Sequence, residues 1–216
     1  MKSPTACIVA FDLDFTLTHF RSGLESLFAT IAQCGVPATI SKPVYRKIIR
    51  SAGGFSPSAM AAALIPYHPH LRTANLERAL TDWLEKNIAL YSDVAAVLAE
   101  LKVRGLLTRI ITAGNEDWQH KKIHCLGLTP DFLHIVSPTA GKGAIIKKIY
   151  AATGCLVVYI DDDVNELDRI CDTNARSAVI SILIVRSTDL HRSVPSRYTH
   201  LRIKQLTEVL SIIDAL

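Results

Sequence analysis

Two aspartates, Asp12 and Asp14, stand directly after the apolar run Cys7–Phe11, and residues of this type at this spacing can do chemistry. Alternate residues of a strand point to opposite faces of a sheet, so the chain must turn here for both carboxylates to reach one site. Two carboxylates this close together are not both comfortably ionised unless a cation lies beside them. The pair therefore predicts a bound metal ion at the end of a strand.

A second group of acids follows another apolar run, Leu156–Ile160. Mutual repulsion makes three consecutive acids costly in an idle surface turn. All-oxygen donor sets suit Mg²⁺ better than Zn²⁺. We interpret these acids as the second half of the metal site, with the register of the ligands left open among Asp161, Asp162 and Asp163.

Two further segments carry groups that could bind an anion. One is the end of the apolar run Thr108–Thr112, and the other is the start of a later helical run. Thr112 offers a hydroxyl, and the turn at Ala113 and Gly114 frees backbone amides. Lys142 lies just before the helical run 144–151, so an ammonium and a helix N-terminus could face one place. With the acids and a cation, this set fits phosphoryl transfer to an aspartate, because a carboxylate that attacks a phosphate dianion needs its charge offset.

The chemistry-bearing residues require a parallel sheet to position them. Continuous apolar runs that alternate with helical patterns are typical of parallel strands covered by helices on both faces, and ligands bind beyond the carboxyl ends of such strands. We therefore predict an α/β fold with a Rossmann-like, three-layer core. The predicted strands are Cys7–Phe11, Thr108–Thr112, Leu133–Val136, Leu156–Ile160 and Val179–Val185.

The connection after the first strand is longer than a sheet requires. Residues 19–88 have helical periodicity and no strand-like run, whereas a plain crossover needs one helix. We predict a small all-helical cap at 19–88, inserted into a core formed by residues 1–18 and 89–216. The predicted helices are Phe20–Gln33, Pro43–Ser51, Ser56–Ile65 and Ala74–Ala89.

Composition limits the class of protein. Hydrophobic residues make up 49% of the chain, which excludes general disorder, and the formal net charge is only +4. The five cysteines form no CxxC pair and the start of the chain resembles no signal peptide, so we expect a cytoplasmic protein. Apolar runs are too short to span a membrane, and we expect neither membrane nor nucleic acid as a partner.

Two polar features favour solvated surfaces over binding sites. His120 and His124 flank Lys121 and Lys122, lack the glutamate of a zinc-binding HExxH pattern, and indicate an exposed helix face. The basic stretch 186–204 lacks the interleaved aromatic residues of a nucleic-acid site and is predicted to be a solvated edge. Its cations are Arg186, Arg192, Arg197, Arg202 and Lys204.

Four segments, taken in order, resemble the motifs of the haloacid dehalogenase superfamily of phosphohydrolases. Val9–Thr18 resembles the first motif, DxDxT, and Ile111–Gly114 resembles the second, with Gln119 and Lys122 in the helix after it. Lys142 falls at the place of the third-motif lysine, and Tyr159–Glu166 is similar to the acidic fourth motif. The family also places a helical cap directly after its first motif.

The resemblance implies a role for each matched residue. Asp12 would be the nucleophile that forms an aspartyl-phosphate, and Asp14 would be the general acid and base. Thr112 and Lys142 would bind the phosphoryl group together with the Ala113 and Gly114 turn. Mg²⁺ would be held by Asp12, by the main-chain carbonyl of Asp14 and by Asp162, with Asp161 or Asp163 as a further ligand. Phe15 departs from the motif, since many members have glycine there.

The resemblance predicts a Mg²⁺-dependent phosphoric monoester hydrolase that acts on a small phosphometabolite. The alternative within the class is a phosphoprotein phosphatase, with phosphotyrosine as its substrate, and a phosphomutase stays open. Asp14 disfavours a dehalogenase, which has no need of a second acid. From another class, a receiver-like phosphoacceptor module also groups aspartates, a threonine and a lysine around Mg²⁺. A receiver carries its phosphoacceptor on a middle strand of a chain nearer 120 residues.

Overall fold

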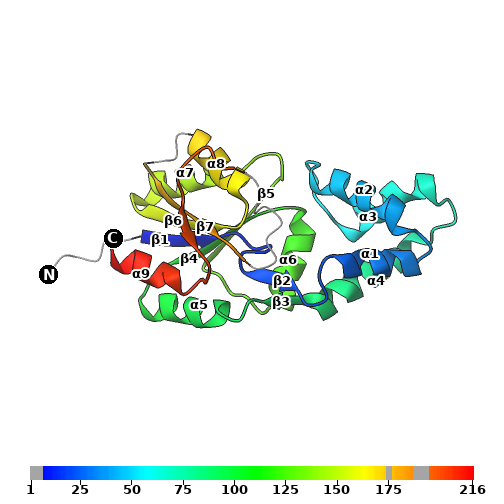
Figure 1. Cartoon of the computed structure of the whole chain (residues 1–216), viewed down its shortest axis with the longest axis horizontal. Helices are drawn as coiled ribbons and strands as arrows, with labels where there is room; N and C mark the ends of the chain where they lie inside the picture. Colours follow the sequence, from blue (N-terminus) through cyan, green and yellow to red (C-terminus); the bar gives the residue numbers. More distant parts are fainter. Residues whose placement is uncertain (1–6, 174–176, 187–194) are drawn as a thin grey trace.

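A parallel sheet of six strands forms the centre of the computed structural model, which describes residues 7–173, 177–186 and 195–216 (Figure 1). The strand order is β5-β4-β1-β6-β7-β8, and each neighbouring pair is parallel. The strands are β1 (Cys7–Phe11), β4 (Thr108–Ala113), β5 (Phe132–Val136), β6 (Leu156–Asp161), β7 (Val179–Ile184) and β8 (Leu201–Ile203). The predicted α/β class is confirmed.

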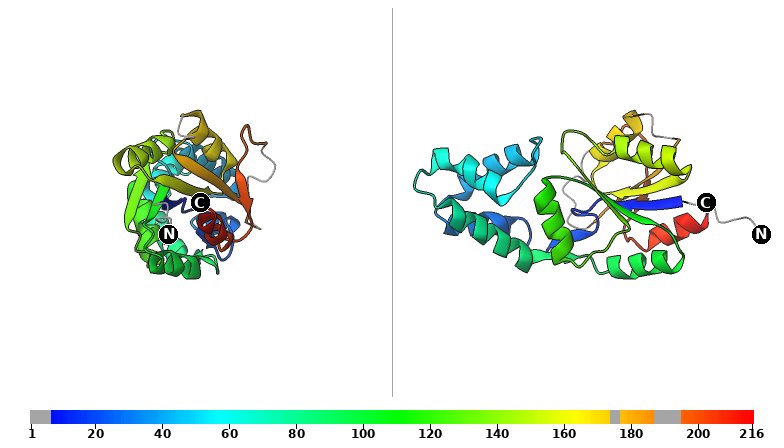
Figure 2. Two further views of the ribbon diagram at one scale, coloured as in Figure 1. Left: turned by 90° about the vertical axis from the view of Figure 1, so that its left-hand side faces the viewer. Right: turned by 180° about the vertical axis from the view of Figure 1, so that it is seen from behind.

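Helices cover both faces of the sheet and give three layers (Figure 2). The side chains of β1 divide between the two faces as a strand requires, with Val9 and Phe11 in one core and Ile8 and Ala10 in the other. The first core is shared with α5 (Val94–Val103) and α9 (Glu208–Asp214), and the second with α7 (Gly143–Thr153) and α8 (Val164–Asp172).

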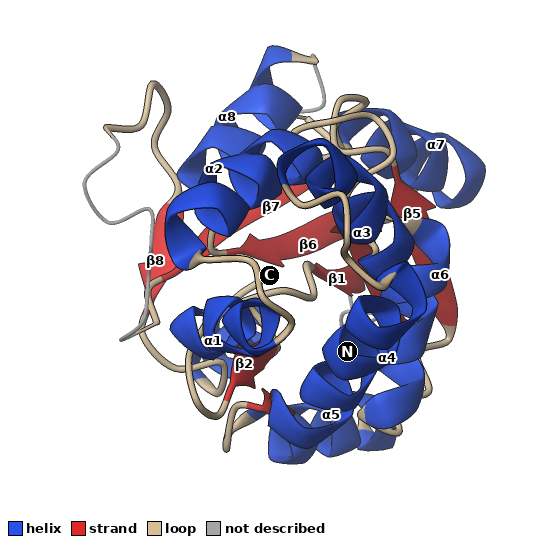
Figure 3. Ribbon diagram, turned by 90° about the vertical axis from the view of Figure 1, so that its right-hand side faces the viewer, coloured by secondary structure: helices blue, strands red, loops and turns tan. Residues whose placement is uncertain are grey.

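Four helices between β2 and β3 form a unit with a hydrophobic core of its own, which we call the helical unit (Figure 3). Buried residues of this core include Leu27, Met60 and Leu80, none of which is more than 1% exposed. The helices are α1 (Glu25–Gln33), α2 (Ala38–Ile49), α3 (Pro57–Leu64) and α4 (Thr73–Asn87), with a short 3-10 helix at Ile65–Tyr67. The cap boundaries at 19 and 88 stay a prediction.

The ends of the predicted helices differ from the observed ones where the chain enters and leaves the helical unit. Strand β2 (Thr18–Phe20) pairs antiparallel with β3 (Ile88–Leu90), where the periodicity predicts helix starting at Phe20 and ending at Ala89. These strands satisfy one another's backbone groups across about 70 residues of sequence, a pairing that local periodicity does not reveal. The two crossings into the helical unit therefore form one small sheet.

Helix α2 begins before the proline that was predicted to start it. It runs from Ala38 and contains Pro43 in its interior, and its buried face is made by Ser41, Val44 and Ile48. Burial of this face at helical spacing outweighs the hydrogen bond that the proline removes. The short strand β8, inside the predicted basic edge, was also missed.

Arg186 contradicts the predicted solvated edge at 186–204. Its side chain is 6% exposed and forms a two-point ion pair with Asp93, at 2.7 and 3.0 Å, while it donates to the carbonyl of Thr16. Arg186 therefore ties β7 to the loop after β1. Arg192 lies outside the described residues.

No helix in the described part of the chain is both long and apolar enough to cross a membrane. All five cysteines lie in the described part of the chain and none forms a disulfide; Cys7 and Cys171 are buried, and Cys34, Cys125 and Cys155 are half-buried.

Candidate active site

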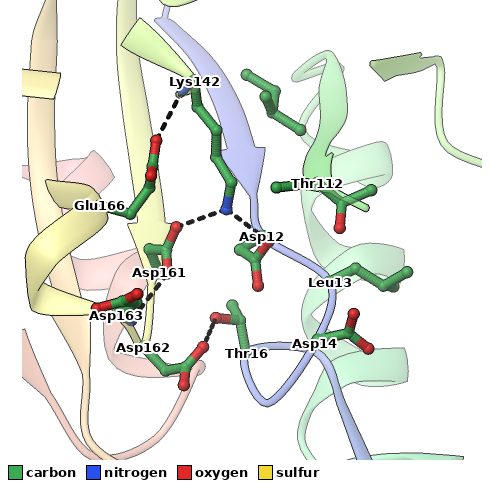
Figure 4. Close-up of polar contacts among 12 residues, drawn as sticks. Asp12, Leu13, Asp14, Thr16, Thr112, Lys142, Asp161, Asp162, Asp163 and Glu166 are labelled. Atoms are coloured by element: carbon green, nitrogen blue, oxygen red, sulfur yellow. Dashed lines mark hydrogen bonds and ion pairs between the residues drawn. The ribbon is translucent and has the colours of Figure 1, made fainter. Parts of the chain in front are cut away.

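The carboxyl ends of β1, β4 and β6 meet at one edge of the sheet, because β1 lies between the other two. This edge brings together Asp12 after β1, Thr112 near the end of β4 and Asp161 at the end of β6 (Figure 4). All three side chains are buried. The position is a topological switch point, where open α/β sheets bind their ligands.

Lys142 joins the two acidic segments. Its Nζ donates to Asp12 Oδ1 at 2.6 Å and to Asp161 Oδ2 at 2.8 Å, and the side chain is 5% exposed (Figure 4). Burial by itself lowers the pKa of this ammonium, but the adjacent carboxylates raise it above its ordinary value. The backbone N–H of Lys142 also donates to Glu166 Oε1, which fixes the start of α7. Lys142 is therefore a permanent positive charge at the predicted phosphate position.

Asp12, Asp161 and Asp162 form a cluster whose carboxylate oxygens lie within 4.8 Å of one another. Their donor set is all oxygen, and in the described part of the chain Lys142 forms ion pairs with Asp12 and Asp161 but not with Asp162, so the residues fit a divalent hard cation such as Mg²⁺. Asp161 already accepts from Lys142, from the Tyr159 hydroxyl and from a backbone N–H. Asp12 and Asp162 retain more acceptor capacity for a cation.

Burial and neighbouring negative charge raise the pKa of two carboxyl groups in this cluster. Burial raises the pKa of Asp12 to about 7, and Asp161 and Asp14 add to the rise while Lys142 opposes it. Burial likewise raises the pKa of Asp162 well above its usual range, with Asp161 and Asp12 contributing. Thr16 offsets part of this cost by donating to Asp162 Oδ1 at 3.1 Å. The cluster favours either protons or a cation.

Asp163, the third acid of the run, has a structural role. Its Oδ1 accepts from the backbone N–H of Asn165 at 2.9 Å and caps the N-terminus of α8. It does not belong to the carboxylate cluster. Among the described residues, the carboxylate cluster thus includes Asp161 and Asp162 and leaves out Asp163, and the assignment of the metal ligands stays a prediction.

We expect Mg²⁺ to stabilise the protein through this cluster. At a concentration about 100 times the Kd, the melting temperature should rise by roughly 5–10 °C. Asp162→Asn should remove most of the rise, whereas Asp163→Asn should keep it, since asparagine also caps a helix. The rise should be larger at about pH 8 than at about pH 6, because Asp12 is increasingly protonated below its pKa of about 7. Differential scanning fluorimetry measures each value, and equal losses in the two variants would contradict the assignment.

Two residues of α6 (Glu116–Cys125) hold Asp14, and sequence reasoning gave neither of them a role. Lys122 Nζ donates to both oxygens of Asp14, at 2.8 and 2.6 Å, and Gln119 Nε2 lies 3.1 Å from Asp14 Oδ2. Gln119 Nε2 also donates to Thr112 Oγ1 at 2.6 Å. Lys122 is 6% exposed, whereas His120 and His124 lie on the exposed face of the helix as predicted. The burial of Gln119 and Lys122 could have been predicted from the sequence, because these residues are one helical turn apart on the face that buries Trp118 and Ile123.

Phe15 adopts a left-handed backbone conformation, with φ 61°. This region favours glycine, which explains why glycine suits this position in the resembling motif. A non-glycine residue held here costs about 1–3 kcal/mol. The Phe15 ring packs edge-on against Phe20, with centroids 5.9 Å apart, and both line the cavity beside Asp12.

A cavity of about 340 Å³ extends from the carboxylates to the helical unit. The loop between α2 and α3 meets the core at its rim. Ser137 Oγ donates to the carbonyl of Ala52 at 2.8 Å, and a Cβ on Gly54 would approach the backbone N of Asn115 to 2.6 Å. Glycine at 54, with φ +64°, therefore permits close contact with the turn after β4. This turn includes Gly114, and Gly114 and Ala113 also line the cavity.

Residues 8–168 match the family model of the haloacid dehalogenase-like hydrolases, and the chain belongs to that family. It is therefore an enzyme of the hydrolase class. The resemblance of the four motifs is confirmed at the level of the family. No curated protein matches the chain in sequence.

Similar solved structures share the fold at low sequence identity. A putative haloacid dehalogenase-like hydrolase from Burkholderia xenovorans LB400 superposes with a TM-score of 0.73 at 15% identity, over 97% of both chains. An L-2-haloacid dehalogenase gives 0.69 at 14% identity, over 98% of this chain and 100% of its own. A predicted phosphoglycolate phosphatase from Haemophilus somnus 129PT gives 0.64 at 14% identity, over 96% and 98%. Identities this low show the fold alone.

Proposed function

We propose that this hydrolase is a Mg²⁺-dependent phosphoric monoester phosphatase that acts through an aspartyl-phosphate on Asp12. The observation that carries the proposal is the buried cluster of Asp12, Asp161 and Asp162, whose charge a single ammonium, that of Lys142, opposes. Displacement of a halide requires no such cation site. Attack of a carboxylate on a phosphate dianion requires it, because like charges must approach one another.

In the proposed first step, an oxygen of Asp12 attacks phosphorus and the ester oxygen leaves. The Lys142 ammonium offsets the charge on the attacking carboxylate and on the phosphoryl oxygens. This electrostatic attraction is stronger in a buried site, because the effective dielectric is lower there. The Thr112 hydroxyl and the amides of the turn after β4 hold the phosphoryl group. Asp12, Asp162 and the main-chain carbonyl of Asp14 would hold Mg²⁺, which supplies charge neutralisation when bound.

Asp14 completes the proposed cycle as general acid and then general base. It protonates the leaving oxygen in the first step and takes a proton from water in the second, so the phosphate is released and Asp12 is regenerated. In the structure Lys122 and Gln119 hold the Asp14 carboxylate at the wall of the cavity. Residues 19–88 would act as a cap that limits access of water to the aspartyl-phosphate.

Hydrolysis of 4-nitrophenyl phosphate tests this proposal. We expect turnover with Mg²⁺, a loss of at least about 100-fold after chelation with EDTA, and recovery when Mg²⁺ is restored. Phosphate release is measured in parallel with halide release from 2-chloropropionate. Halide release without phosphate release would contradict the phosphatase, and phosphate release that survives chelation would contradict the metal.

The default substrate is a small phosphorylated metabolite, in the cytoplasm. A phosphoprotein is the alternative substrate. The predicted phosphoglycolate phosphatase among the similar structures supports phosphatase chemistry on this fold. Phosphoglycolate, the substrate in the name of that protein, carries a carboxylate as a second anionic group.

A further inference from the structure

Two groups of aromatic rings line the cavity beside the carboxylates. In the first group Phe20 packs against Phe15 and against Trp83, with ring centroids 5.9 and 4.8 Å apart. In the second group Phe55 contacts Tyr45 and Trp118, at 5.3 and 5.6 Å. All six rings line the cavity. A flat apolar group in the cavity would therefore meet aromatic rings.

The helical unit contributes no charge to this cavity. Among the described lining residues, those it supplies are apolar or aromatic apart from the hydroxyl of Tyr45. The cations of the cavity come from the core, where Lys142, Lys122 and Arg169 are each paired with a carboxylate. A second phosphate or a carboxylate on the substrate would thus meet no cation across the cavity from Asp12, and its desolvation would be uncompensated.

Three further details of the lining bear on the substrate. Phe15 keeps a strained left-handed backbone and places an aromatic ring at the cavity, where glycine would cost nothing. Burial raises the pKa of the Tyr45 phenol, with nearby Asp14 adding to the rise, so this hydroxyl is a neutral donor close to the proposed acid. The indole N–H of Trp83 donates to Ser26 Oγ at 2.9 Å, which orients the ring.

We propose that the substrate is a small phosphate monoester whose alcohol carries an aromatic or other flat apolar group and no second anion. The inference rests on the proposed phosphatase function and adds the substrate class. The phosphoryl group lies at Asp12 and Lys142, and the apolar group packs against the aromatic rings that line the cavity. A cavity of about 340 Å³, at the small end of ligand pockets, favours a small molecule over a peptide.

The test compares alcohols of similar leaving ability, so that reactivity does not imitate recognition. With Mg²⁺ present, kcat/KM for 2-phenylethyl phosphate should exceed that for ethyl phosphate by at least about 30-fold. Phosphoglycolate should be no better than ethyl phosphate. A ratio near one, with both esters hydrolysed, overturns the substrate class and leaves the phosphatase standing. No hydrolysis of any ester overturns the phosphatase itself.

A charge placed in the cavity should change this preference. Ile49 lines the cavity, yet its side chain is 37% exposed, so Ile49→Arg is compatible with folding. This variant should lower the preference for 2-phenylethyl phosphate about tenfold and raise kcat/KM for phosphoglycolate about tenfold. Ile65→Arg is the matched control, because Ile65 is 43% exposed and lies outside the cavity lining. Equal effects of the two substitutions would contradict the inference.

The peptide alternative has its own arm in the same assay. A phosphotyrosyl peptide of about ten residues is compared with free phosphotyrosine and with 2-phenylethyl phosphate. We expect the 2-phenylethyl ester to be the best of the three. A peptide that is hydrolysed at least tenfold more efficiently than both small esters would overturn the small-molecule form of the proposal.

Discussion

Asp12→Asn should lower kcat for phosphate ester hydrolysis by about 10⁴-fold or more, because it removes the carboxylate nucleophile of the first step. The substitution is nearly isosteric, and it should not unfold the protein. The pKa of Asp12 is raised to about 7, so between about pH 4 and pH 7 the folded state binds more protons than the unfolded state. Metal-free wild type should therefore lose stability as pH rises through this window, and the neutral asparagine should remove that part of the loss.

Steady-state kinetics and melting temperatures measured on the same samples separate the two effects. Asp214→Asn is the matched control, since Asp214 is an exposed carboxylate that pairs with Arg104 far from the site. It should change kcat little. Substantial turnover by Asp12→Asn, or unfolding of that variant in the absence of Mg²⁺, would contradict the role given to Asp12.

Lys142→Met should damage both catalysis and stability. Without the ammonium, Asp12 and Asp161 face one another with no cation inside a buried site, and breaking a buried ion pair costs about 3–5 kcal/mol. For a chain of this size we expect the melting temperature to fall by roughly 10 °C. The loss should be larger at about pH 8 than at about pH 5, because protonation of the carboxylates relieves the repulsion. We expect kcat to fall by about 10²–10³-fold.

Lys147→Met is the control on the same helix, where Lys147 is exposed. It should leave both kcat and the melting temperature within experimental error of wild type. Mg²⁺ should restore part of the stability of Lys142→Met and little of its activity, because the cation offsets the carboxylates without replacing the contact to phosphate. Full activity in a folded Lys142→Met protein would contradict the assigned role.

The strands and the edge where they end could be predicted from local pattern. Continuous apolar runs such as Cys7–Phe11 and Leu156–Ile160 fix buried strands, and parallel strands share one carboxyl edge. The positions of Asp12, Thr112 and Asp161 follow from that topology alone. Boundaries were less predictable, since Thr18–Phe20 becomes a strand only through its distant partner Ile88–Leu90.

Contacts between distant segments determine the roles of residues that the local sequence pattern does not distinguish. The sequence left three acids equivalent, and the start of α8 separates them because its backbone donors recruit Asp163 as a cap. Lysine side chains are mostly exposed in proteins. Packing of α6 against the loop after β1 nevertheless buries Lys122, whose ammonium donates to Asp14.

The amino-acid sequence by itself thus determined the family and the α/β class and predicted the reacting groups, because these depend on residue types at short spacing. Only the tertiary structure decided which acids share the carboxylate cluster, the partners of Asp14 and the aromatic lining of the cavity beside Asp12. Those features arise where segments that are far apart in sequence meet in a buried site, and there the free energy of each charge depends on which partner it meets.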